Sequence, residues 1–225
     1  MAAAAGLVLA VTSPLEAQVA PSAAEVGRYT GLHAAAHLGD LTALEKLISA
    51  RAALDTRDGN GRTPLHVATF ARQRAAIRVL AKGGAALDLL ENDRYDAVTI
   101  AAVAGDEETL SALLSLGASV RQVTSRYDGT ALIAAAHLGH AGVVKQLIAA
   151  GAPLDHVNNL HWTAVIESIV LGDGGPRHVA TVRALVDAGA STRLADRQGV
   201  TPLELAQARG YREMVEILEK AGARR

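Results

Sequence analysis

Large aliphatic residues recur along the chain in groups separated by three or four positions. An α-helix has 3.6 residues per turn, so this spacing places the side chains of each group on one face of a helix. Six groups each predict a short amphipathic helix: Leu44/Leu47/Ile48, Ile77/Leu80, Leu110/Leu113/Leu114, Val144/Leu147/Ile148, Val182/Leu185/Val186 and Val215/Leu218. No single group can bury its apolar stripe alone, so we expect these units to stack on one another.

A shorter helix is predicted before each stripe, beginning at a Thr or Asp whose side chain can cap it. In Gly61–Ala68, the Thr63 hydroxyl can accept from a free backbone N–H, and Pro64 suits the first helical position. Equivalent segments recur at intervals of 33, 33, 34, 33 and 38 residues, beginning at Thr30, Thr63, Asp96, Thr130, Thr163 and Thr201. A glycine suited to the left-handed turn that ends a helix follows in five units: Gly39, Gly105, Gly139, Gly172 and Gly210. The second unit has Arg72 there, so its turn is expected to differ.

The segment Thr63-Pro64-Leu65-His66-Val67-Ala68 has the form T-P-L-H-x-A, and with this period the chain resembles ankyrin repeat proteins over roughly residues 30–225. The resemblance implies an all-α fold, a solenoid of about six helix-turn-helix repeats with short hairpin-like loops. We expect residues 1–21 to be a signal peptide or a disordered tail, and residues 22–225 to be the repeat domain. The predicted units are 22–57, 58–90, 91–124, 125–157, 158–195 and 196–225.

Composition narrows the possible functions. The formal net charge is −1, so general affinity for nucleic acid or anionic membranes is not indicated. The sequence contains no cysteine, which excludes disulfides, thiol catalysis and cysteine zinc sites. It also lacks Gly-x-Ser-x-Gly and phosphate-binding loop motifs, and we therefore expect neither catalytic residues nor a cofactor.

The N-terminal residues Met1 to Val11 form an uncharged apolar run. Its length fits the apolar part of a secretory signal and is too short to span a bilayer. No Lys or Arg precedes it, and the candidate cleavage point after Ala20 is followed by Pro21, which leaves a disordered tail as the alternative. Export would give a periplasmic or secreted protein, and its absence a cytoplasmic one.

Histidines are the first candidates for chemistry. In ankyrin repeats the residues equivalent to His33 and His66 are structural, because they join neighbouring helices through hydrogen bonds. His33 and His37 are four residues apart and His137 and His140 three apart, but neither pair belongs to a metal-binding motif. We expect no metal site.

The ankyrin resemblance implies a concave face formed by the loop tips and by the ends of the first helices. Aromatic and arginine side chains on such a surface dominate interface energetics. The residues predicted to bind a partner there are Arg62, Phe70, Tyr95, Arg126, Tyr127, His137, Leu138, Trp162, Val170 and Leu171. An alternative for Trp162 is that it only packs against the next loop.

The fifth unit departs most from the others. Glu167 stands where the second unit has Val67, a position that faces the stack, so Glu167 is expected to be at least partly buried. The inserted segment Leu171 to His178 offers partners for the carboxylate: the backbone N–H groups of residues 173–175, or His178. Glu167 would then hold a Gly-rich loop in place, or Trp162, Glu167, Asp173 and His178 would form a polar pocket for a ligand.

These observations favour a non-enzymatic protein–protein interaction module that binds an unidentified protein through its concave face. The alternative is a ligand-binding or enzymatic site at the insertion of the fifth unit. We expect a monomer that neither binds nucleic acid nor inserts stably into a membrane.

Overall fold

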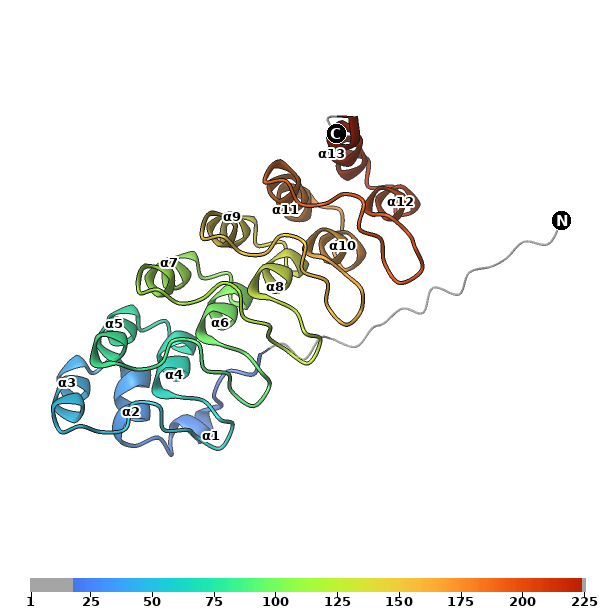
Figure 1. Cartoon of the computed structure of the whole chain (residues 1–225). Coiled ribbons are helices and arrows are strands. Elements are labelled where there is room, and N and C mark those ends of the chain that lie inside the picture. Colours follow the sequence, from blue (N-terminus) through green and yellow to red (C-terminus); the bar gives the residue numbers. More distant parts are fainter. Residues whose placement is uncertain (1–17, 224–225) are drawn as a thin grey trace.

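The computed structural model describes residues 18–223, and the apolar run at 1–11 lies outside this range. The short helix α1 (Ala23–Val26) is followed by six helix pairs in single file (Figure 1). The pairs are α2 (Gly31–Leu38) with α3 (Leu41–Ser49), α4 (Pro64–Phe70) with α5 (Arg74–Gly83), α6 (Ala97–Val103) with α7 (Glu107–Ser115), α8 (Ala131–His137) with α9 (Ala141–Ala149), α10 (Ala164–Val170) with α11 (Pro176–Asp187), and α12 (Pro202–Ala208) with α13 (Arg212–Ala223). This is the predicted all-α solenoid: residues 18–223 contain no strand, only one isolated bridge between Thr124 and Gly129.

The first helix of most pairs begins at the predicted cap. The Thr63 hydroxyl accepts from the N–H of His66, and the Asp96 carboxylate accepts from the N–H of Thr99 at 2.7 Å. Thr130, Thr163 and Thr201 cap α8, α10 and α12 in the same way, whereas the Thr30 side chain makes no capping hydrogen bond. These bonds satisfy N–H groups that have no partner within a helix, and they explain why the element boundaries recur with the sequence period.

The apolar core runs along the whole stack. The first helices contribute most, and residues 64–69, 97–102 and 164–169 are buried without exception. The second helices contribute their aliphatic stripes, in which Leu44, Leu80 and Leu110 are fully buried. Each pair packs against the next, so burial between units supplies most of the stability, as expected for repeat arrays. No helix within residues 18–223 is long and apolar enough to cross a bilayer.

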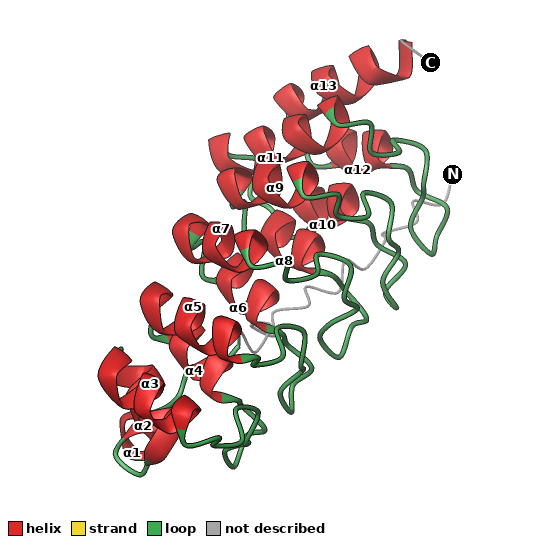
Figure 2. Cartoon of the chain, turned by 60° about the vertical axis from the view of Figure 1, so that its left-hand side comes forward, coloured by secondary structure: helices red, strands yellow, loops and turns green. Residues whose placement is uncertain are grey.

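The loops that join one pair to the next project together from one side of the stack (Figure 2). Their tips are linked by backbone hydrogen bonds: Asn92 donates to Asn60, Ser125 to Arg94, and Asn159 to Tyr127, at 2.9–3.0 Å. Neighbouring loops therefore support each other along the array.

Two turns differ from their predictions. Arg72 takes a left-handed φ of 55°, close to the 68° of Gly39, so the second unit has the turn of the other units despite its arginine. In the fifth unit the left-handed residue is Gly174 rather than Gly172. Because α11 begins at Pro176 and has 12 residues, the inserted loop is confined to residues 171–175 and His178 lies within the helix.

Candidate functional site

A cavity of about 170 Å³ is lined by residues of the loops and of the first helices. The ends of α6 and α8 and the loop residues before them form its walls, which include Tyr95, Val103, Tyr127, Ile133 and Leu138. These walls are mainly apolar. His137, Asn158 and Glu167 are among the polar residues that also line the cavity. A mainly apolar recess with a few convergent polar groups is the usual form of a binding site.

Glu167 provides the carboxylate of this cavity. It lies on α10 and is only 5% exposed, so the prediction that it is buried is confirmed. One carboxylate oxygen, Oε1, accepts from the Asn158 side-chain amide at 2.9 Å. The other, Oε2, lies 3.3 Å from Nδ1 of His137 on the neighbouring helix α8. The partners of Glu167 therefore differ from the expected ones, which were the backbone of residues 173–175 and His178.

The expected polar pocket of Trp162, Glu167, Asp173 and His178 is not formed as one group. His178 contacts Asp173 through Nδ1 at 2.8 Å and donates from Nε2 to the backbone carbonyl of His137 at 2.9 Å. The Asp173 carboxylate also accepts from the N–H of Gly175, and this bond and the one from His178 lower the pKa of Asp173. These contacts hold the inserted loop against α8, and neither Asp173 nor His178 lines the cavity.

Four of the residues predicted to bind a partner meet in the cavity: Tyr95, Tyr127, His137 and Leu138. Tyr95 and Tyr127 come from consecutive loops, and His137 and Leu138 from the end of α8. Burial raises the pKa of Tyr95, which keeps its hydroxyl neutral. Tyr95 and Tyr127 lie more than 30 positions apart in the sequence, and the stacking of consecutive repeats brings both to the cavity.

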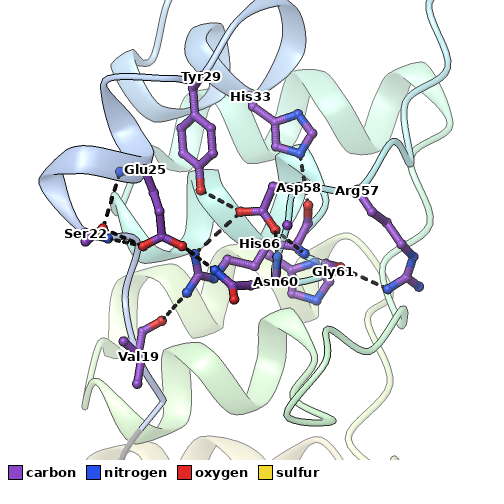
Figure 3. Close-up of polar contacts among 12 residues, drawn as sticks. Val19, Ser22, Glu25, Tyr29, His33, Arg57, Asp58, Asn60, Gly61 and His66 are labelled. Carbon is purple, nitrogen blue, oxygen red and sulfur yellow. Dashed lines mark hydrogen bonds and ion pairs between the residues drawn. The ribbon is translucent and has the colours of Figure 1, made fainter.

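Arg62 differs from the prediction, because it lies inside the protein and is only 4% exposed. Three of the residues that it contacts, Val19, Glu25 and Asp58, are labelled in Figure 3. Its Nη1 lies 3.2 Å from Glu25 and 3.5 Å from Asp58, and its Nη2 donates to the Val19 carbonyl at 2.8 Å. Asp58 also accepts from the Tyr29 hydroxyl at 2.8 Å. The loop tip of the second unit therefore anchors the N-terminal segment instead of offering a free guanidinium to a partner.

Hydrogen bonds account for the charge state of this network. Bonds from the Ser22 side chain and backbone lower the pKa of Glu25 to about 2. Burial opposes ionisation of Asp58, but bonds from Tyr29 and from the backbone of Asn60 and Arg62 outweigh it and lower the Asp58 pKa. Both carboxylates are thus held in the charged form that attracts Arg62.

The other predicted residues lie outside the cavity. Phe70 is half-buried beside Arg62, whose guanidinium carbon is 5.8 Å from the ring centroid. Trp162 is half-buried and packs against the core. Val170 and Leu171 are half-buried at the end of α10, and Arg126 is exposed on its loop. Phe70 and Trp162 therefore do not line the cavity that Tyr95 and Tyr127 share.

The repeat histidines make the expected structural hydrogen bonds. Nδ1 of His66 accepts from the N–H of Thr63 at 3.0 Å, and its Nε2 donates to the Leu89 carbonyl at 2.9 Å. His33 donates to the Arg62 carbonyl at 2.9 Å. Within residues 18–223 no group of three or more His, Cys, Asp or Glu side chains is placed to hold a metal ion.

Asn158 and Gln18 are among the cavity residues that were not predicted from the sequence. Asn158 occupies the loop position at which the second and sixth units have Asp58 and Asp196. The same unit also has Glu167 where the second unit has Val67. The two changes together could have indicated that Asn158 and Glu167 contact each other. Gln18 precedes the repeats, and no periodic pattern places it.

Comparison with known proteins identifies the fold family. A model of ankyrin repeats, covering three copies, matches residues 32–124, 100–190 and 132–224. The chain is similar to YahD of Escherichia coli, described as an ankyrin repeat protein, with 38% identity over 119 residues, which are 52% of this chain and 59% of that protein. The chain thus spans about three fifths of this curated relative.

Solved structures agree with this assignment. One relative is an ankyrin repeat domain from Acinetobacter baumannii, with 41% identity, coverage of 85% of this chain and 97% of that chain, and a TM-score of 0.80. Another is the ankyrin repeat domain of Bcl-3, a member of the IκB family, with 26% identity, coverage of 87% of each chain and a TM-score of 0.76.

Proposed function

This chain belongs to the ankyrin repeat family, and we propose that it is a non-enzymatic module that binds a partner protein through its concave face. Ankyrin repeats are typical protein–protein interaction modules. Here the observation that supports the proposal is the cavity between the third, fourth and fifth units, which Tyr95, Tyr127 and Leu138 line together with the buried Glu167. A preformed recess with aromatic walls loses little conformational entropy when a partner binds to it.

The inserted loop of the fifth unit is the weaker candidate. Both ring nitrogens of His178 are engaged, one with Asp173 and the other with the His137 carbonyl. These contacts support a structural role for the insertion.

The proposed location is periplasmic or secreted, and the N-terminal sequence of the mature protein tests this.

The binding proposal is tested by affinity capture from the native host with a matched pair of variants. Leu138→Glu places a charge in the cavity wall, whereas Lys145→Glu reverses an exposed charge on α9, a second helix of the array. Partner recovery should fall at least about tenfold for Leu138→Glu, which corresponds to about 1.4 kcal/mol, and stay at the wild-type level for Lys145→Glu. Circular dichroism should show both variants folded. Equal recovery of the same partners by the two variants would place the binding surface elsewhere.

A further inference from the structure

We propose that the concave cavity binds the ammonium group of a lysine side chain carried by an extended segment of the partner protein. This inference rests on the proposed function, since it takes the partner to lie on this face. It goes further by assigning the chemistry of the contact: Glu167 receives the charge, and the apolar walls receive the hydrocarbon part of the side chain.

The buried carboxylate of Glu167 favours a cationic ligand. A carboxylate that is 5% exposed is costly unless it is paired. Asn158 supplies a neutral donor to Oε1, and His137 neutralises the charge only when its imidazole is protonated. Within residues 18–223 the ion-pair partner of Glu167 is this histidine rather than a Lys or Arg, although the carboxylate lines an open cavity. A cation entering the cavity would complete the pairing.

The lining of the cavity favours a lysine side chain. Beside Glu167 it includes the apolar side chains of Val103, Ile133 and Leu138. Lysine combines four methylene groups, which suit apolar walls, with a charged end, which suits the carboxylate. Arginine suits the site less well. Its planar fork favours two free carboxylate oxygens, and here one oxygen is bonded to Asn158 and the other faces His137.

The chain's own N-terminal segment already contributes a residue to the cavity. Gln18 lines it, and its side-chain amide nitrogen is buried without a hydrogen-bond partner. The next residue, Val19, is held by the bond from Arg62 to its carbonyl. The chain thus brings one of its own side chains to the cavity, but glutamine has one atom less reach than lysine and carries no charge. Gln18 is therefore a poor substitute for the ligand that fits.

A substitution at Gln18 tests this within one chain, with residues 1–225 retained. Gln18→Lys brings an ammonium to the cavity, and Gln18→Met provides an unbranched apolar side chain as the matched control. We expect the unfolding midpoint of Gln18→Lys to exceed that of Gln18→Met by about 2–4 °C. The difference should disappear in the Glu167→Gln background, where the new side-chain amide keeps an oxygen able to accept from Asn158. An equal midpoint for the lysine and methionine variants, or a gain that persists without Glu167, would overturn the proposal.

A second measurement uses peptides in solution and does not depend on the stability of the Glu167 variant. The protein carries Gln18→Ala so that the cavity is vacated, and three probes are titrated: Ac-Ala-Ala-Lys-Ala-Ala-NH₂, the same peptide with norleucine for lysine, and n-butylammonium. The lysine peptide should bind at least about tenfold more tightly than either other probe.

The outcomes separate this inference from the proposed function. Equal binding of the lysine and norleucine peptides would refute a role for the charge, although the face would still bind peptides. Binding of n-butylammonium as tight as that of the lysine peptide would refute an extended protein segment as the ligand. If no probe bound while Leu138→Glu still lost its captured partner, the lysine site would be wrong and the interaction module would stand.

Discussion

The buried histidine of the second unit should make the stability of this protein fall in mildly acidic solution. His66 is 1% exposed, and burial lowers its pKa from 6.5 to about 4. The neutral ring also accepts a hydrogen bond at Nδ1 from the Thr63 N–H, which a protonated Nδ1 could not accept. A histidine whose pKa is lower in the folded state binds fewer protons there than in the unfolded state. Its contribution to stability is therefore complete above about pH 6.5 and is lost as the pH falls toward 4.

The size of the effect follows from these two pKa values. The full difference corresponds to about 3.4 kcal/mol, and at pH 4.5 about 2.5 kcal/mol of it should already be lost relative to pH 7.5. At pH 5.5 the expected loss relative to pH 7.5 is about 1.3 kcal/mol. The lowered pKa of His140 acts in the same direction, whereas the raised pKa of Asp96 acts in the opposite one. A variant of His66 must therefore be compared with the wild type at each pH.

The assay is urea unfolding of the wild type and of His66→Gln between pH 7.5 and 4.5. Glutamine does not titrate and retains an amide that can donate to the Leu89 carbonyl. At pH 7.5 the variant should be less stable by about 1–3 kcal/mol, because the Thr63 N–H loses its acceptor. This deficit should shrink by about 2.5 kcal/mol on going to pH 4.5, and comparing the urea dependence of the two proteins checks that both unfold in the same cooperative step. A deficit that stays constant with pH would refute the assignment of the pH dependence to His66.

Two further variants test the polar contacts that hold the array. Arg62→Met should lower the free energy of unfolding by about 3 kcal/mol, since it leaves the largely buried Asp58 carboxylate without its cation. Arg28→Met, at an exposed position of the N-terminal segment, is the control. Equal unfolding midpoints for the two variants would contradict the role of Arg62. His178→Ala should cost about 2 kcal/mol, because it removes the bonds to Asp173 and to the His137 carbonyl, and leaves a cavity beside α8. Calorimetry measures the loss, and a midpoint within about 1 °C of wild type would show that the inserted loop holds its position without His178.

Local sequence patterns were sufficient to predict most of the fold. Most first helices begin at a residue whose side chain caps the backbone three positions on, as at Asp96 and Thr99, so these contacts depend on nearby residues alone. Comparison between units was also informative: Glu167 stands where another unit has Val67, and this equivalence correctly predicted that it is buried. The same comparison failed at Arg72, because packing of the helix pair imposes the left-handed turn on a residue that does not favour it.

The sequence by itself therefore determined the repeat, the helices and their buried faces, because all of these follow from residues at fixed short separations. The tertiary structure decided which groups meet between units. It placed His137 and Asn158 against Glu167. It also buried Arg62 beside Glu25 and Asp58, and it placed Gln18 at the cavity. Such contacts depend on the direction of each side chain across the stack and on the path of each loop, and neither repeats with the sequence period.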